Sequence, residues 1–360
     1  VGMFATHLMA LERQDGTRTL TGLLADGRAS ALFAVLAGVG IALSTGGPRG
    51  LPDARSHLAA AVGLLVRAAL ITFVGLALVE LDSFVAVILA YYGLLFVVAT
   101  PLLRLPPAVL AIGAVLACGL TPVLSIALRA DRPKFDGGQP GLDALTQPGP
   151  LFEALALTGY YPVLTWTTYL LTGMAVGRLD LRRARVAWWL LGVGTALAVA
   201  ASVTSTLLLG PGGGSAVLGR AAEQHFYGTT PTGTWWWLAI DAPHSGAPLD
   251  LAHTTGTALA VLGLMLLLAR WSRALVWVPA AVGAIPLTLY TVHVAAVAAV
   301  PSTLGARPSA DLTLWLIHVG AAILLGVTIA ALGVRGPLES VVSRLSRLAR
   351  RLVAGRAVQR

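Results

Sequence analysis

Charged side chains are scarce in this sequence. They make up 11% of its 360 residues, whereas 56% of the residues are hydrophobic and the mean hydropathy is +0.80. A water-soluble domain carries about 25% charged residues, so this chain has too few of them to face water on all sides. Apolar runs of roughly 20 residues recur along it, which is the length of a membrane-spanning helix. The composition therefore excludes a soluble globular protein and predicts an all-α, polytopic membrane helix bundle rather than a β-barrel.

Several chemical motifs are also missing. The single cysteine, Cys118, lies within an apolar run, so neither a disulfide nor a thiolate metal cluster is available. The sequence has no GxSxG nucleophile elbow and no HExxH zinc motif, and we expect no metal. The net charge of +9 fits membrane topology better than nucleic-acid binding, because most arginines lie in short loops and near the C-terminal end. We therefore expect no nucleic-acid partner.

The apolar runs predict about ten spans within a transmembrane domain of residues 1–334. The first span would be truncated, because the chain opens in an apolar stretch too short to cross a bilayer and shows no secretory signal peptide. Residues 335–360 form a basic amphipathic tail, which we expect to lie on the anionic inner leaflet. The predicted spans are Val1–Leu11, Ala29–Ser44, His57–Val79, Phe84–Thr100, Pro106–Leu128, Tyr160–Val176, Val186–Leu209, Thr254–Ala269, Ala274–Val300 and Leu312–Gly333.

The basic residues predict how the chain is oriented. If the spans alternate, the side that holds the C-terminus carries roughly twice as many basic residues as the other side. This bias predicts a protein of the plasma membrane with a cytoplasmic C-terminus. The two longest connections, Arg129–Gly159 and Gly210–His253, then face outward, and loops of such length usually carry function or are disordered.

One outward-facing stretch, Trp235–Gly256, combines polar residues in an unusual way: WWWLAIDAPHSGAPLDLAHTTG. Asp250 and His253 are three residues apart, so on a helix they share a face. An aspartate beside an imidazole orients it and raises its basicity, as general-base catalysis requires. His244, Asp250 and His253 could also hold zinc, but the turn-rich spacing argues against it. We interpret these three residues as catalytic candidates.

Other polar residues lie in or beside the spans. Arg67 lies within an apolar span and has no acid within one helical turn. A charge at that depth costs on the order of 3 kcal/mol, so we expect Arg67 to face an internal cavity, with a structural tie between helices as the alternative. Asp26 and Arg28 lie where the second span begins, and they are either a helix cap with a snorkelling arginine or part of a site. Tyr160 and Tyr161 open the sixth span, where an aromatic interface belt is the alternative.

Several stretches together resemble a known family. They are VGMFATHL, LADGRASALFAVLAGVGIAL, TGYYPVLTWTTYLLTGMAVGRL, PHSGAPLDLAHTTGTALAVLGL, IPLTLYTVHVA and RGPLES. Across nearly the whole chain they resemble bacterial membrane proteins related to the lysosomal heparan-alpha-glucosaminide N-acetyltransferase. The likeness to the lysosomal enzyme itself is concentrated in the first two spans. The resemblance implies transfer of an acyl group from cytoplasmic acyl-CoA, with acetyl-CoA as the expected donor, to a hydroxyl or amine of an extracytoplasmic glycan or glycolipid.

The sequence departs from the lysosomal enzyme at one position of consequence. That enzyme has a catalytic histidine shortly before its second span, and the matching stretch here, DGTRTLTGLLADGR, has none. His7 is the nearest substitute, so the expected base is either His7 or the pair His244 and His253, with Asp250 beside His253. Arg28 or a backbone N–H would stabilise the oxyanion. We assign Asp26, Tyr160, Tyr161, Trp236 and Trp237 to the acceptor and Arg49, Arg67, Arg104 and Arg182 to acyl-CoA.

Two other classes of function compete with an acyltransferase. Closely packed, glycine-rich helices suit a transporter or flippase for a lipid-linked or anionic solute. Coupled transporters commonly keep a buried acid, however, and none of the predicted spans carries one near its middle. A structural or assembly protein would leave the outward-facing polar residues without a role. Membrane lipids are further expected partners, and pairing as a homodimer stays open. Consumption of acyl-CoA separates the first class from the other two.

Overall fold

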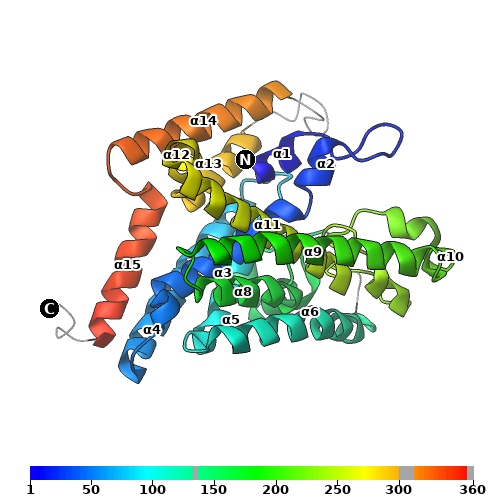
Figure 1. Cartoon of the computed structure of the whole chain (residues 1–360), viewed down its shortest axis with the longest axis horizontal. Helices are drawn as coiled ribbons and strands as arrows, with labels where there is room; N and C mark the ends of the chain where they lie inside the picture. The colour runs from blue at the N-terminus through cyan, green and yellow to red at the C-terminus, as the bar shows by residue number, and fades with distance from the viewer. Residues whose placement is uncertain (133–136, 300–311, 355–360) are drawn as a thin grey trace.

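The structure is a computed structural model that describes residues 1–132, 137–299 and 312–354. These residues form helices joined by turns and loops, which confirms the all-α prediction. Figure 1 shows one bundle in which many long helices run along the longest axis.

Six helical segments of the described chain are long and apolar enough to cross a membrane. Two further helices, α12 (Arg273–Gly283) and α13 (Pro286–Ala298), meet this condition only together, and they are bent by 61° relative to each other. The chain is therefore a multi-pass membrane protein with six or seven candidate spans among the described residues, and the predicted ten are not confirmed. The six segments are Leu20–Ser44 (α2, Leu20–Leu24, with α3, Arg28–Ser44), α4 (Ala54–Val79), α6 (Pro107–Arg129), α9 (Ala184–Leu209), α11 (Pro248–Trp271) and α14 (Leu312–Ala331).

Three of the predicted spans are shorter than a membrane crossing requires. They correspond to α1 (Gly2–Leu8), α5 (Leu89–Ala99) and α8 (Val163–Gly177). Most side chains of α5 and α8 are buried, because other helices surround them. A helix enclosed by protein does not face lipid, so the thickness of the bilayer does not fix its length. A fourth predicted span, Ala274–Val300, also differs from the structure. It is divided between α12 and α13, and its last residue lies outside the described chain.

The core lies where α3 packs against α8, with Val35, Leu170 and Met174 almost fully buried. Arg178, just after α8, is buried as well and ties together one end of this core. Its guanidinium donates to the carbonyl oxygens of Ala42 at 3.1 Å and Thr45 at 2.9 Å, and to those of Gly47 and Leu103. The loops that follow α3, α5 and α8 therefore meet at the same end of the bundle, opposite the end where α3 begins.

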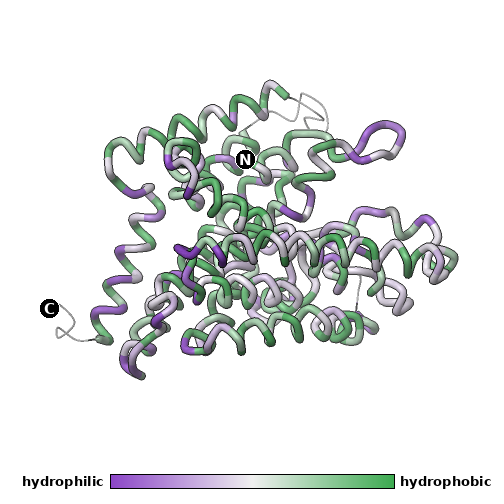
Figure 2. Tube along the Cα trace, viewed as in Figure 1, coloured by the Kyte–Doolittle hydropathy of each residue, from purple (hydrophilic) through white to green (hydrophobic). Residues whose placement is uncertain are grey.

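The last helix, α15 (Pro337–Ala354), packs along α4 (Figure 1). It is amphipathic, as expected, with polar and apolar residues alternating along its length (Figure 2). Val342 is buried, and Glu339 accepts hydrogen bonds from the backbone N–H and the hydroxyl of Thr288 at 2.9 and 2.5 Å. Glu339 thereby caps the first turn of α13, which fixes the start of α15 against the bundle. The remaining short helices are α7 (Pro148–Glu153) and α10 (Gly214–Leu218).

Candidate functional site

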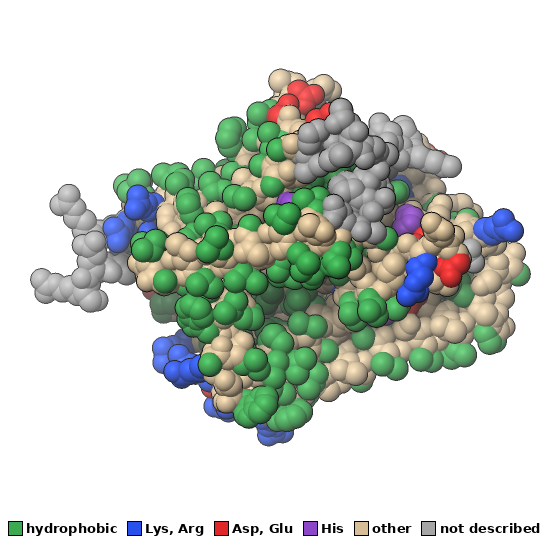
Figure 3. All heavy atoms as spheres, turned by 90° about the horizontal axis from the view of Figure 1, so that it is seen from above, with side chains coloured by type: hydrophobic (Ala, Val, Ile, Leu, Met, Phe, Trp, Pro, Cys, Tyr) green, Lys and Arg blue, Asp and Glu red, His purple; other side chains and the backbone are tan. Residues whose placement is uncertain are grey.

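A cavity of 430 Å³ lies between α1 and the beginnings of α3 and α8. Phe84 and Ala86, shortly before α5, also line it, so the two short helices α5 and α8 both begin near this space. Figure 3 shows a histidine next to acidic and basic side chains at the right of this view, while further basic side chains lie at the left and much of the surface between is apolar. Five residues predicted for the site line the cavity: His7, Asp26, Tyr160, Tyr161 and His244.

Asp26 and His244 form a pair in the wall of this cavity. The Nε2 atom of His244 lies 3.6 Å from Oδ1 of Asp26. Gly27, with φ of +67°, makes the approach possible, because a Cβ atom there would lie 2.9 Å from Cβ of Pro243. His244 itself has φ of +59°, a left-handed conformation that is uncommon outside glycine. A residue held in such a conformation is often part of a functional site.

The surroundings of His244 keep its imidazole neutral near pH 7. Burial lowers the pKa of His244 below its ordinary value, the carboxylate of Asp26 opposes this change, and His225 adds to the lowering. A neutral imidazole has a lone pair that accepts a proton, which is what a general base needs. His225 also lines the cavity, and its Nε2 lies 3.6 Å from Oε2 of Glu12. Neither Glu12 nor His225 was predicted for the site, because neither lies in a motif that would indicate a role.

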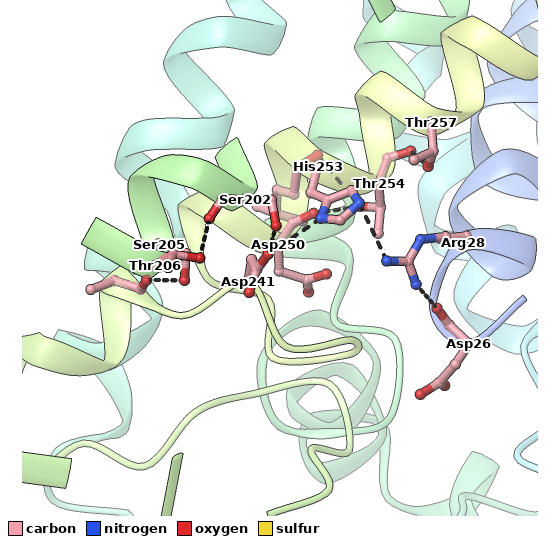
Figure 4. Close-up of polar contacts among 12 residues, drawn as sticks. Asp26, Arg28, Ser202, Ser205, Thr206, Asp241, Asp250, His253, Thr254 and Thr257 are labelled. Carbon is pink, nitrogen blue, oxygen red and sulfur yellow. Dashed lines mark hydrogen bonds and ion pairs between the residues drawn. The ribbon is translucent and has the colours of Figure 1, made fainter. Parts of the chain in front are cut away.

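A second chain of polar contacts lies beside the cavity (Figure 4). Nη2 of Arg28 lies 3.3 Å from Nε2 of His253, and Nδ1 of His253 lies 3.4 Å from Oδ2 of Asp241. Because a guanidinium only donates, Nε2 of His253 is the acceptor and Nδ1 carries the proton that faces Asp241. Burial alone would raise the pKa of Asp241, but hydrogen bonds from His253 and Ser202 bring it below its ordinary value. Both nitrogens of His253 are thus engaged.

The predicted pairing of Asp250 with His253 is wrong. Asp250 is buried, and its Oδ2 accepts a hydrogen bond from the backbone N–H of Gly246 at 3.0 Å. It occupies the third position of α11, from which an acidic side chain reaches back to the chain just before the helix, as in a capping box. Asp241 is the aspartate that contacts His253, and it lies in the quoted stretch Trp235–Gly256 without having been singled out.

Arg28 is placed to hold the site together. Besides contacting His253, it donates to the backbone carbonyl of Asp26 at 3.3 Å. It is absent from the residues that line the 430 Å³ cavity, although its neighbours Gly27, Ala29 and Ser30 line it. This geometry does not support the expected contact of Arg28 with an oxyanion. Arg28 instead connects the backbone of Asp26, the residue that pairs with His244, to His253 of α11, which in turn contacts Asp241.

His7 belongs to a cluster of aromatic rings. Its Nδ1 lies 3.0 Å from Nε2 of His293, which is buried in α13. The ring of His293 stacks on Phe4 at 4.0 Å and meets His318 edge-on at 5.0 Å. No regular spacing in the sequence connects these residues. His7 is therefore held from behind by His293 while it lines the cavity.

The aromatic residues assigned to the acceptor fall into two groups. Tyr160 and Tyr161 line the cavity, and the hydroxyl of Tyr161 donates to the carbonyl of Ala86 at 3.2 Å. Trp237 is buried against Phe226, with 5.9 Å between the ring centroids. Trp236 lines a separate apolar hollow of 340 Å³ with Trp235 and Leu208. Neither Trp236 nor Trp237 lines the 430 Å³ cavity, so the structure does not bring them to the other residues assigned to the acceptor.

The arginines assigned to acyl-CoA are not all brought together. Arg67 lines a cavity of 320 Å³ between α3, α4 and α15. Arg49, Arg104 and Arg182 are exposed near the same end of the bundle but do not line this space. The other arginines that line it are Arg335, Arg347 and Arg350. Within the described residues, no group of three or more His, Cys, Asp or Glu side chains is arranged to hold a metal ion.

Comparison with known proteins yields one match. A family model described as "Heparan-alpha-glucosaminide N-acetyltransferase, catalytic" matches residues 3–209, which is more than half of the chain. The matched part includes His7, Asp26 and Arg28 and ends before His244. No curated protein and no solved structure matches the chain.

Proposed function

Since the chain belongs to the family of the heparan-alpha-glucosaminide N-acetyltransferase catalytic domain, we propose that it is a membrane acetyltransferase that uses acetyl-CoA. The acceptor is a hydroxyl or amine of an extracytoplasmic glycan or glycolipid. The observation that carries this proposal is the His244–Asp26 pair in the wall of a 430 Å³ cavity, to which the matched segment contributes His7, Asp26 and Tyr160.

The base in this proposal is His244. Its imidazole removes the proton of the acceptor as the acceptor oxygen or nitrogen attacks the thioester carbonyl of acetyl-CoA. The tetrahedral intermediate then collapses, the C–S bond breaks, and the imidazolium returns the proton to the leaving thiolate to give free CoA. Asp26 stabilises the imidazolium that forms between these two steps. His253 is unsuited to this role, because the lone pair of its Nε2 already accepts a hydrogen bond from Arg28.

His7 and the tyrosines position the acceptor. His7 is anchored by His293, and Tyr161 is anchored by the carbonyl of Ala86, so both rings present fixed polar edges to the cavity. Fixed groups of this kind reduce the entropy lost when a substrate is oriented for attack. Tyr160 and Asp26 add further hydrogen-bonding groups for the hydroxyls of a sugar.

The two cavities suit a donor and an acceptor that arrive from opposite sides. Ser30 lines the 430 Å³ cavity, whereas Ser44 lines the basic cavity at the other end of α3. About 20 Å of helix separates them, at 1.5 Å per residue. The arginine-rich end faces the cytoplasm in this proposal, as the distribution of basic residues favours, and the pantetheine arm runs along α3 toward His244.

The test is acetyl-CoA consumption by the purified full chain in lipid nanodiscs. Free thiol is followed after addition of glucosamine or of a lipid extract from bacterial membranes, and the products are identified by mass spectrometry. We expect acetylated product and thiol in equal amounts, with loss of both in His244→Gln. His57→Gln, a change in the second turn of α4 at the opposite end of the bundle, is the matched control. An absence of thiol release with every acceptor would refute the proposal and favour the transporter.

A further inference from the structure

We propose that the cavity between α3, α4 and α15 binds phosphate groups through the guanidinium groups of Arg67, Arg335, Arg347 and Arg350. Phosphate reaches such a site either as part of CoA or as the head group of an anionic phospholipid. Only the first source rests on the proposed function, whereas the binding chemistry is the same for both.

The four arginines come from separate parts of the chain and converge on one space of 320 Å³. Arg67 comes from α4, Arg335 precedes α15, and Arg347 and Arg350 are three residues apart on one face of α15. The hydroxyl-bearing residues that also line the cavity are Ser44, Thr45, Ser343 and Ser346. The hydroxyls of Ser44 and Thr45 already donate to helix carbonyls, so the donors suited to phosphate oxygens are the guanidinium groups and the buried hydroxyl of Ser346, which has no hydrogen-bond partner.

The cavity lacks a counter-charge of its own. No Asp or Glu is among its lining residues, and within the described chain none of the four guanidinium groups forms an ion pair. Glu339, at the start of α15, hydrogen-bonds to Thr288 of α13 and offsets part of the positive charge through its electrostatic interaction with Arg67, which leaves the cavity with a net positive charge. Four like charges around one space repel one another, so an anion that enters it removes this repulsion as well as forming its own contacts.

The backbone of α4 makes room for this arrangement. Gly63 lines the cavity, and a Cβ atom on it would lie 2.4 Å from Cγ of Arg350. The stem of Arg350 therefore rests directly on α4, which leads its guanidinium into the cavity. Arg67 also lines the cavity, and the guanidinium carbon of Arg67 lies 5.7 Å from the centre of the Phe96 ring. A planar guanidinium held in this way matches phosphate with two parallel hydrogen bonds, which a lysine does not provide.

The variants are a matched pair on one helix. Arg347→Gln with Arg350→Gln removes two charges from the cavity. Arg344→Gln with Arg351→Gln removes two charges from the exposed face of α15 and is the control. If the first double variant does not fold, the single variant Arg335→Gln replaces it, with Arg344→Gln as its control. Thermal melting of every variant checks folding.

Two probes separate the sources of phosphate. Adenosine 3′,5′-bisphosphate, a fragment of CoA, is titrated by calorimetry into the full chain in phosphatidylcholine nanodiscs. Retention of phosphatidylglycerol is measured by native mass spectrometry. Loss of charged hydrogen bonds in the cavity is expected to weaken binding of at least one probe by about tenfold or more, and the control by less than twofold.

The outcomes distinguish the two proposals. Weakened nucleotide binding assigns the cavity to CoA, and weakened lipid retention alone assigns it to phospholipid. Equal binding of both probes by the cavity variant and the control would overturn the phosphate site. If the wild-type chain binds nucleotide in an arginine-dependent way but never releases thiol from acetyl-CoA, the phosphate site stands and the proposed acetyl transfer fails.

Discussion

His244 and Asp26 meet at 3.6 Å although one follows α10 and the other precedes α3. The contact depends on the turn at Gly27, which carries Asp26 against Pro243 and His244. Two segments far apart in the sequence thus form one edge of the cavity.

Replacing His244 with glutamine is expected to lower acetyl transfer by about 100- to 10,000-fold, the usual loss when a general base is removed. His253→Gln is expected to retain more activity, because the nitrogens of His253 are both engaged with Arg28 and Asp241. Initial rates at equal protein level measure both changes. Lower activity in His253→Gln than in His244→Gln would reverse the assignment of the base.

The pH dependence of turnover should report His244. Its pKa lies below the ordinary value of 6.5 because the side chain is buried, so the base is neutral at pH 7 and activity is lost only as the pH falls through that lowered pKa. Asp26→Asn removes the carboxylate that raises this pKa. The acidic limb of kcat/KM should therefore move to lower pH while the maximum rate falls. An acidic limb that moves to higher pH in Asp26→Asn would contradict the pairing.

The proposed orientation is tested by labelling. In a Cys118→Ala background, Thr17→Cys lies in an exposed loop at the end that carries the His244 cavity, and Arg344→Cys lies on the exposed face of α15. We expect an impermeant thiol reagent to label the first position in intact cells and the second only after the membrane is opened. Labelling of Arg344→Cys in intact cells would place the arginine-rich end outside and remove the topological support for a cytoplasmic donor.

Arg178→Met is expected to destabilise the fold; Arg178 lines neither cavity, although its partner Thr45 lines the 320 Å³ one. Arg178 donates to carbonyls at the ends of three segments, and loss of a hydrogen bond to a charged group costs about 1.5–3 kcal/mol. Thermal unfolding in detergent should therefore shift by several degrees. Arg185→Met, an exposed change nearby, is the control. Equal melting temperatures for the two variants would show that the buried contacts of Arg178 contribute little.

Long lipid-facing helices were predicted well because their apolar runs must match the bilayer. The predicted span Val186–Leu209 differs from α9 by two residues at its start, and Pro106–Leu128 differs from α6 by one residue at each end. The lengths of α5 and α8 were not predictable in this way. These helices are enclosed by protein, and the space near their first residues is occupied by the cavity rather than by further turns.

For the site, the sequence predicted only which residues lie at the same end of the bundle. His7, Asp26 and His244 were placed on one side by counting spans, and they do line one cavity. The contacts of His253 with Asp241 and of His7 with His293 join different segments of the fold, so sequence spacing does not indicate them. Helical spacing favoured Asp250 as the partner of His253. The carboxylate of Asp250 instead accepts a hydrogen bond from the backbone N–H of Gly246, which lies just before α11 where backbone N–H groups have no partner within the helix.

The separation of the two cavities along α3 has an electrical consequence. About 20 Å of helix lies between Ser30 and Ser44, less than the ~30 Å hydrocarbon core of a bilayer. Solution that fills both cavities carries the potential of each side inward, so the membrane voltage falls over a thinner layer and the field there is steeper. A unit charge that crosses the full voltage changes in energy by about 2.3 kcal/mol per 100 mV. In the proposed mechanism His244 takes up and returns a proton at the edge of this layer, so acetyl transfer in proteoliposomes is expected to vary with an imposed potential.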